Sequence, residues 1–366
     1  MMKTNIKSHG FLLQSLYSFQ VKSNNLNNKK RQIQQQNKKR KNMDFKLLKQ
    51  LYKIHSKSGY EGKIISFVCK WIDKNIQDVK IELDWNTGNI YIIKGKANSY
   101  PCMVAHLDQV QKYHPTDFTV IETKDLLFGY SPKERSFCGL GADNKNGVWL
   151  CLQCLQKFDC IKVAFFVSEE VGCIGSSKAN MDFFNDCRFV IQPDRKGNND
   201  VITQIGFMDI CSDDFIKDIT PEKFGYKPTE GMMTDVEQLK ENGLNVSCIN
   251  VSCGYYEPHT DNEFTDKNDL MKCLAFIEYI ITHCTKVYSH EPGMMKGYDC
   301  QLVWWEQYEE VYELIKETLI SDPTLTPTDL HSFYHDEFPL LGLDDFAMIC
   351  DDAMTELYYE RNGDVA

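Results

Sequence analysis

Long apolar runs are missing from this sequence. No apolar stretch in its 366 residues approaches the 18 or more that a membrane helix needs, so we expect a soluble globular protein without a membrane partner. Residues 10–21 are apolar, but this stretch is short and lacks a small-residue cleavage site, which argues against a secretory signal.

Acidic residues are missing from the first 43 positions, which contain ten Lys or Arg. Residues 22–42 are rich in Asn, Gln and Lys and cannot bury enough apolar surface to fold, so we expect residues 1–42 to form a basic, disordered extension. It could be a basic tail, an organellar presequence or upstream sequence from an over-extended gene model. The last is favoured, because presequences prefer Arg and Ser.

Basic charge is scarce in the rest of the chain. The 41 basic residues of the whole sequence, less these ten, leave 31 against 52 acidic residues, a net charge of −21. Because phosphate contacts need a basic face, we expect no nucleic-acid partner. An acidic body is compatible with bound divalent cations.

Regularly spaced cysteines are also missing. The 15 cysteines are an odd number without a repeating spacing, which favours reduced thiols and a cytoplasmic protein over a disulfide framework. The CxxC pair, Cys151 and Cys154, lies on the apolar face of a predicted helix at 144–158. We therefore expect both thiols to pack in the core.

Strand-like and helical patterns alternate after residue 43. Residues 79–95 predict a β-hairpin, and apolar runs at 102–105, 162–167 and 187–192 are typical of strands buried on both faces. Helices are predicted at 144–158, about 175–186 and 266–284. This alternation predicts an α/β fold, a three-layer sandwich with a central mixed, mostly parallel sheet flanked by helices. We expect one folded domain at 43–290 and an acidic, mainly helical C-terminal segment at 291–366.

Five apolar or glycine-rich stretches each end in a carboxylate or an imidazole. These stretches deliver, in chain order, His106, Asp143, the pair Glu169 and Glu170, Asp194, and His259. In open α/β sheets, ligand crevices form beyond the carboxyl ends of the strands. Two imidazoles with several carboxylates are a ligand set suited to Zn²⁺, Co²⁺ or Mn²⁺.

Acidic residues in and beside this series can serve roles other than binding a metal. Residues two apart in a strand point to the same side, so Asp108 can hold the imidazole of His106. The adjacent Glu169 and Glu170 point in different directions, so one can bind metal while the other carries a proton. Each short motif alone is more typical of a polar strand end or a solvated pair.

The order of these motifs resembles the co-catalytic two-zinc peptidases of the M20/M28/M42 clan. The matching stretches are MVAHLDQV (103–110), GLGADNKNG (139–147), FFVSEEVGCIGS (165–176), QPDRKGNND (192–200) and GYYEPHTDNEF (254–264). The resemblance extends from residue 43 to residue 284 and implies a zinc exopeptidase-like fold. In motif wording it is closest to a lid-less M20 (peptidase T-like) metallopeptidase.

The resemblance implies a role for each of the matched residues. Asp143 would bridge two divalent metal ions, with zinc favoured and cobalt or manganese possible alternatives. His106 and Asp194 would complete the ligands of one ion, and Glu170 and His259 those of the other.

Two further residues would act beside the metals. Glu169 would be the general base that takes a proton from a metal-bridging hydroxide or water, and Asp108 would support His106. The peptide bond between Asp143 and Asn144 is expected to be cis, as is typical of the clan.

These roles imply an enzyme that cleaves amide bonds, favoured as an aminopeptidase or small-peptide exopeptidase. An N-acyl amino-acid deacylase or amidase of the same fold, or a catalytically silent binding module, are the alternatives. The substrate would be a short peptide or an N-acyl amino acid. Candidates to line the substrate site are Arg195, Tyr255, Tyr256 and Asp235. A surface ion pair for Arg195 and core packing for the tyrosines compete with that role.

Two spacings argue against an inserted domain. From Asp194 to His259 there are 65 positions, too few for the lid domain that many M20 enzymes carry there. From His106 to Asp143 there are 37, too few for the extra β-domain that M42 enzymes insert. We therefore expect a single-domain catalytic core.

Overall fold

The computed structural model describes residues 45–206, 208–291, 300–334, 337–338 and 341–362. The extension predicted at 1–42 lies outside the described residues. The chain divides into two compact units, one up to residue 292 and one from residue 293, with residues 206–208 grouped with the second. No helix in the described part of the chain is long and apolar enough to cross a membrane.

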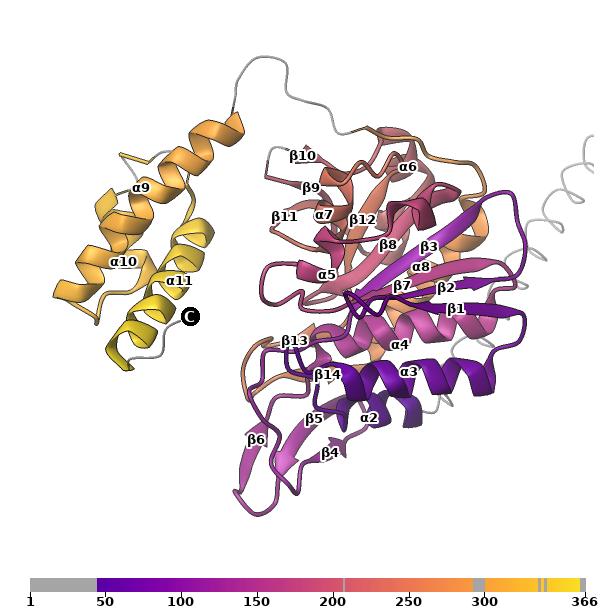
Figure 1. Cartoon of the computed structure of the whole chain (residues 1–366), viewed down its shortest axis with the longest axis horizontal. Coiled ribbons are helices and arrows are strands. Elements are labelled where there is room, and N and C mark those ends of the chain that lie inside the picture. Colours follow the sequence, from indigo (N-terminus) through magenta and orange to yellow (C-terminus); the bar gives the residue numbers. More distant parts are fainter. Residues whose placement is uncertain (1–44, 207, 292–299, 335–336, 339–340, 363–366) are drawn as a thin grey trace, which may run out of the picture. The chain divides into compact units, whose positions relative to one another are not determined.

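A nine-stranded sheet forms the centre of the first unit (Figure 1). Its strands run in the order β1-β2-β7-β3-β8-β12-β9-β10, with β11 paired to β9. Their bounds are β1 Val79–Leu83, β2 Ile90–Lys94, β3 Tyr100–His106, β7 Ile161–Phe166, β8 Cys187–Arg195, β9 Asp200–Ile205, β10 Met208–Asp209, β11 Lys227–Gly231 and β12 Cys248–Ser252.

The strand directions confirm the predicted mixed, mostly parallel sheet. β3 pairs in parallel with both β7 and β8, and β12 pairs in parallel with β8. The predicted hairpin is present as β1 and β2, which pair antiparallel and join the sheet through β2 and β7. Parallel strands place their carboxyl ends at one edge, which is where His106, Glu169 and Asp194 follow or end β3, β7 and β8.

Helices cover both faces of this sheet, giving the expected three layers. One face packs on α2 Lys46–Tyr52, α3 Gly62–Asn75, α4 Ala142–Lys157, α6 Asp213–Ile219 and α8 Lys267–His283, which share one apolar cluster. The other face is covered by α5 Ile174–Ser177 and α7 Asp235–Glu241. Successive residues of β3, such as Met103 and Val104, are fully buried on opposite faces, because both faces of the sheet are covered.

The single helix predicted at about 175–186 is wrong, because the structure has two short elements there. The structure has α5 at Ile174–Ser177 and a separate 3₁₀ turn, η1, at Met181–Phe184; a second 3₁₀ turn, η2, spans Pro221–Phe224. Asn180 between α5 and η1 is extended, and its side chain accepts a hydrogen bond from the Asp182 N–H. An Asn that bonds the backbone locally favours a cap over a helix interior, which explains the break.

A second, antiparallel sheet was not predicted from the sequence. It consists of β4 Thr119–Glu122, β5 Leu126–Ser131, β6 Ser136–Cys138, β13 Tyr255–Tyr256 and β14 Phe264–Asp266. The pairing of β14 with β5 holds the segment around His259 beside the segment that leads to Asp143, more than a hundred residues earlier in the chain. The two motifs that those segments carry are thereby brought together.

Cys151 and Cys154 are fully buried in the apolar cluster, as predicted. Every cysteine whose side chain the structure describes is free. The CxxC spacing therefore follows the buried face of α4.

The second unit contains three helices in its described part: α9 Cys300–Ser321, α10 Pro327–Tyr334 and α11 Leu343–Asn362. These helices agree with the mainly helical segment expected from the sequence, and residues 322–326 separate α9 from α10. This unit has its own apolar cluster, which includes Val311, Ile315, Leu330, Phe346 and Ile349.

Candidate metal centre

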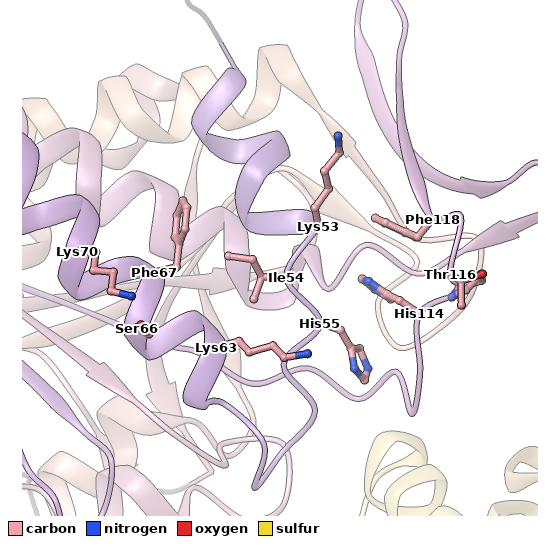
Figure 2. Close-up of a pocket in the computed structure, with 11 residues that line it drawn as sticks. Lys53, Ile54, His55, Lys63, Ser66, Phe67, Lys70, His114, Thr116 and Phe118 are labelled. Carbon is pink, nitrogen blue, oxygen red and sulfur yellow. The ribbon is translucent and has the colours of Figure 1, made fainter.

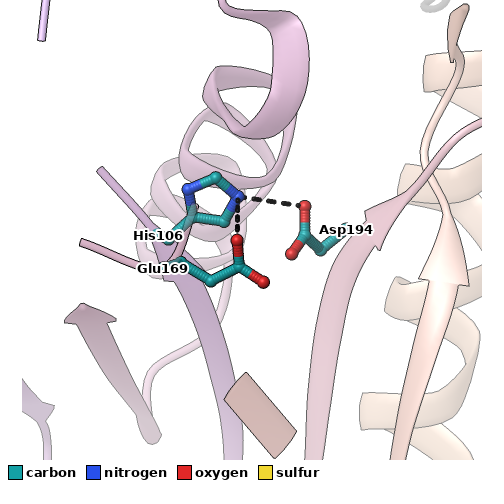
Figure 3. Close-up of side chains that lie close together, drawn as sticks. All are labelled: His106, Glu169 and Asp194. Atoms are coloured by element: carbon teal, nitrogen blue, oxygen red, sulfur yellow. Dashed lines mark ion pairs between the residues drawn. The ribbon is translucent and has the colours of Figure 1, made fainter. Parts of the chain in front are cut away.

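His106 ends β3 with its side chain 1% exposed, and its two ring nitrogens face different partners. Nδ1 lies 3.2 Å from Asp108 Oδ1, so the tautomer protonated at Nδ1 satisfies this contact. Nε2 faces three carboxylate oxygens: Asp143 Oδ1 at 3.2 Å, Asp194 Oδ1 at 3.4 Å and Glu169 Oε2 at 3.7 Å. Figure 3 shows the Glu169 and Asp194 carboxylates turned towards this nitrogen. An imidazole fixed in this way is typical of a metal ligand.

Asp143 lies between two imidazoles. Its Oδ1 is 3.2 Å from His106 Nε2, and its Oδ2 is 3.4 Å from His259 Nε2. The residue follows Gly141 at the start of α4, and the Asp143–Asn144 peptide bond is cis, as the resemblance implies. Each carboxylate oxygen therefore faces a different nitrogen, which is the arrangement of a bridging ligand.

His259 supplies the second imidazole from the loop between β13 and β14. Its side chain is 54% exposed, in contrast to that of His106, and its Nε2 is 3.1 Å from Glu170 Oε2. Its φ of 64° lies in the left-handed region, where non-glycine residues are uncommon and cluster at functional sites. The more exposed side of the cluster is thus the side of His259.

Glu169 and Glu170 diverge, as predicted. Glu169 approaches His106, whereas Glu170 approaches His259. The Asp108 carboxylate accepts both of their backbone N–H groups, at 3.0 Å and 3.2 Å. Asp108 therefore positions the loop that carries the two glutamates in addition to the His106 ring.

Asp194, near the end of β8, is held by a buried polar network. Gln192 Nε2 donates to Asp194 Oδ2 at 2.8 Å and to Asp235 Oδ2 at 3.2 Å. The side-chain oxygen of Gln192, Oε1, accepts hydrogen bonds from the Thr234 hydroxyl and from the backbone N–H of Val236, at the start of α7. The network leaves Asp194 Oδ1 facing the centre.

Several carboxylates lie close together in the centre and are largely buried, so each disfavours the charged form of its neighbours. Burial raises the pKa of Glu169 and Asp194, with neighbouring carboxylates adding to the rise and His106 opposing it. Burial also raises the pKa of Glu170, and the Asp143 charge adds to it. For Asp143 itself burial acts in the same direction, but the two imidazoles outweigh it and hold its pKa below the usual value. Positive charge would relieve these conflicts.

The donor set fits divalent cations. His106 with Glu169 and Asp194, and His106 with Asp143 and Glu170, each offer ligand atoms within 4.8 Å of one another. The buried atoms Asp194 Oδ1 and Glu170 Oε1 accept no hydrogen bond from the described residues. Buried oxygens without a donor are costly, and a cation at the centre would satisfy both.

The candidate substrate residues differ in their exposure and in the contacts they make. Arg195 is partly exposed, and its Nε lies 3.9 Å from Asp200 Oδ2. Tyr255 is 3% exposed and packs in the apolar cluster. The Tyr256 hydroxyl donates to Asp269 at 2.7 Å, and its ring stacks on Phe264. Asp235 is fully buried, so it acts through Gln192 and does not line a substrate surface.

The sequence analysis did not identify Glu263, whose carboxylate binds the backbone at the proposed bridging residue Asp143. This residue is 1% exposed, and its carboxylate accepts the N–H groups of Gly141 at 2.7 Å and Asp143 at 3.0 Å. Burial raises its pKa to about 7. The signal was present in the stretch 254–264, where Glu263 follows His259 by four positions, but only β14 pairing shows that it reaches Asp143.

No protein-family model matches the sequence, and no curated protein matches it either. Solved structures do share its fold. The aminopeptidase PepT from Bacillus cereus aligns with a TM-score of 0.55 at 12% identity, over 66% of this chain and 97% of its own. The aminopeptidase APDkam598 from the archaeon Desulfurococcus kamchatkensis aligns at 0.52 and 14%, over 69% and 98%. A TET aminopeptidase from a marine sediment archaeon of the Thaumarchaeota aligns at 0.51 and 12%, over 65% and 95%. At these identities the likeness shows that the chain has the fold of these aminopeptidases.

Proposed function

We propose that this protein is a dinuclear-metal-dependent aminopeptidase. One observation carries the proposal: the two oxygens of Asp143 face two separate imidazoles, at 3.2 Å and 3.4 Å. Each imidazole has a further carboxylate beside it, Asp194 for His106 and Glu170 for His259. This is the pattern of two adjacent cation sites that share one bridging ligand.

The proposed ligands divide into two sets. His106, Asp143 and Asp194 would hold one ion, and His259, Asp143 and Glu170 the other. Two divalent ions, for which zinc is proposed, supply positive charge that lowers the pKa of a water molecule and polarises the scissile carbonyl. Their charge would also balance the excess of buried carboxylates.

Glu169 is the proposed general base. Its Oε2 lies near the His106 nitrogen, but at 3.7 Å it is the most distant of the three carboxylates that face Nε2. Its raised pKa suits a group that takes a proton from the attacking water and returns it to the leaving amine. Asp108 holds both the Glu169 backbone and the His106 ring, so it fixes the distance between base and metal ligand.

The finer assignments rest on the motifs. We propose a short peptide as substrate, a peptidase T-like relationship within the clan, and a catalytic core at 43–290 that works without a lid domain. Arg195 is proposed to contact the substrate, whereas Tyr255 packs in the apolar cluster and the Tyr256 hydroxyl donates to Asp269. The free, mostly buried cysteines support the cytoplasm as the compartment.

Elemental analysis combined with a panel of peptides and N-acyl amino acids tests this function. We expect about two divalent ions per chain and release of N-terminal residues from short peptides. Glu169→Gln should keep both ions and lower kcat by about 10²- to 10⁴-fold, as is usual for loss of a general base. The same substitution at the adjacent residue, Glu170→Gln, should instead lower the metal content, because Glu170 is a proposed metal ligand.

Two results would contradict the proposal. Purified protein that takes up no divalent metal lacks the proposed centre. Undiminished hydrolysis in Glu169→Gln removes the proposed base. Turnover of N-acyl amino acids but not of peptides would replace the aminopeptidase by a deacylase with the same centre.

A further inference from the structure

A hollow lies outside the metal centre, beside the N-terminal half of α3. It has a volume of about 590 Å³ and shares no lining residue with the proposed metal ligands (Figure 2). Its wall contains Lys53, Lys63 and Lys70, the imidazoles of His55 and His114, and apolar side chains that include Phe67 and Phe118. This volume is within the range of small-molecule sites.

The basic wall has a simple structural origin. Lys63, Ser66, Phe67 and Lys70 lie at helical spacings of three and four along α3, so they share one face of the helix. Lys53 follows directly after α2. The ammonium groups therefore come from α3 and from the residue that follows α2.

These three lysines have no acidic partner. All three are exposed, and none of them forms an ion pair or a side-chain hydrogen bond with a described residue, whereas Lys49, Lys157, Lys162 and Lys267 of the same unit are paired with acidic side chains. No Asp or Glu lines the hollow. In a chain with a net charge of −11, three unpaired cations on one concave surface leave a local positive potential.

The two histidines form an uncharged part of the wall. His114 stacks on Phe118 with ring centroids 4.0 Å apart and an interplanar angle of 11°, and His55 lies 4.9 Å from His114. Burial and nearby lysines lower the pKa of both rings, that of His114 to about 3. Near neutral pH the positive charge is therefore that of the lysines, and the stacked rings offer an aromatic surface. Figure 2 shows Lys63 extending towards His55.

We propose that this hollow binds a small organic phosphate, a phosphate monoester attached to an aromatic body. A phosphate monoester carries about two negative charges and three acceptor oxygens, which matches several ammonium donors better than a single carboxylate does. The Phe67, Phe118 and imidazole surfaces suit the aromatic body. The site is independent of the peptidase chemistry, because it uses none of the residues of the metal centre.

Isothermal titration of the metal-loaded protein with AMP tests this site, and adenosine and inorganic phosphate serve as partial ligands. We expect one AMP per chain, at least tenfold weaker binding of adenosine and of phosphate, and loss of affinity as salt is raised. The double variant Lys63→Ala/Lys70→Ala should weaken AMP binding by about 100-fold, about tenfold for each charge-assisted contact.

Two matched variants locate the binding. Lys74→Ala removes an exposed lysine of the same helix outside the hollow and should leave AMP affinity unchanged. His259→Ala disrupts the metal centre and should also leave it unchanged, since the phosphate is not expected on the metals.

Several results would overturn the proposal. These are no saturable AMP binding, adenosine binding as tightly as AMP, full affinity in Lys63→Ala/Lys70→Ala, or loss of AMP binding in His259→Ala. Lysine-dependent binding of an acidic peptide by a protein that ignores AMP would assign the hollow to a different ligand.

Discussion

Removing divalent metal from this protein should lower its melting temperature by about 10 to 20 °C. The reason lies in the proposed centre, where Asp108, Asp143, Glu169, Glu170 and Asp194 converge on two imidazoles. Burial and mutual repulsion raise the pKa of three of these carboxylates. Bound cations relieve this conflict in the folded state, and the unfolded chain has no preformed site for them.

The size of the effect follows from mass action. An ion present at 100 times its dissociation constant stabilises the fold by about 2.7 kcal/mol, so two ions contribute about 5 kcal/mol. The described part of the first unit, residues 45–205 and 209–291, has 244 residues, and at this size each kcal/mol shifts the melting temperature by about 2 to 4 °C. The shift of about 10 to 20 °C is the product of these values.

Calorimetry with zinc, manganese or a chelator measures this shift. Asp143→Asn should lose more than half of the metal-dependent increment, because both proposed ions share this carboxylate. Glu230→Gln, which changes an exposed carboxylate on β11, should keep the full increment. Melting that is unchanged by metal and chelator, or an Asp143→Asn protein that gains as much as the wild type, would refute the reasoning.

Two other variants probe the surroundings of the centre. Glu263→Gln leaves one of the Gly141 and Asp143 N–H groups facing an amide NH₂, so we expect metal affinity to fall about 10- to 100-fold in competition titrations. Unchanged affinity would mean that Glu263 does not position the bridge. His114→Phe should flatten the loss of stability in acid. Wild-type His114 has a folded pKa of about 3 against about 6.5 when unfolded, so between these values the unfolded chain binds the extra proton and stability falls as pH falls, by up to about 1.4 kcal/mol per pH unit. Urea unfolding from pH 4 to 7 measures the slope, and equal slopes in the two proteins would contradict this prediction.

Much of the fold could be predicted because its signals are local. The sequence runs that form β3, β7 and β8 are nearly continuous in apolar residues. This pattern is typical of strands that are covered on both faces. The amphipathic periods of α4 and α8 predicted those helices in the same way. The helix predicted at about 175–186 is interrupted because the Asn180 side chain accepts a hydrogen bond from the Asp182 N–H and caps a separate 3₁₀ turn.

The second sheet was not predicted, because its strands are short and one of its pairings is remote. β14 has three residues and pairs with β5, which lies more than 130 positions earlier in the chain, whereas β4 and β6 pair with β5 locally. Neither strand shows enough alternation to identify a partner. The support that Glu263 gives to Asp143 depends on this sheet and was missed for the same reason.

The sequence by itself determined which residue types arrive at the carboxyl edge of the sheet, and in what order. It also separated Glu169 from Glu170, because adjacent residues must point in different directions. Only the tertiary structure decided which atoms meet: that Asp143 faces both imidazoles, that Asp108 holds the glutamate loop, and that three lysines surround an uncommitted hollow. Order along the chain follows from local chemistry, whereas distances across a sheet follow from packing between segments that the sequence leaves far apart.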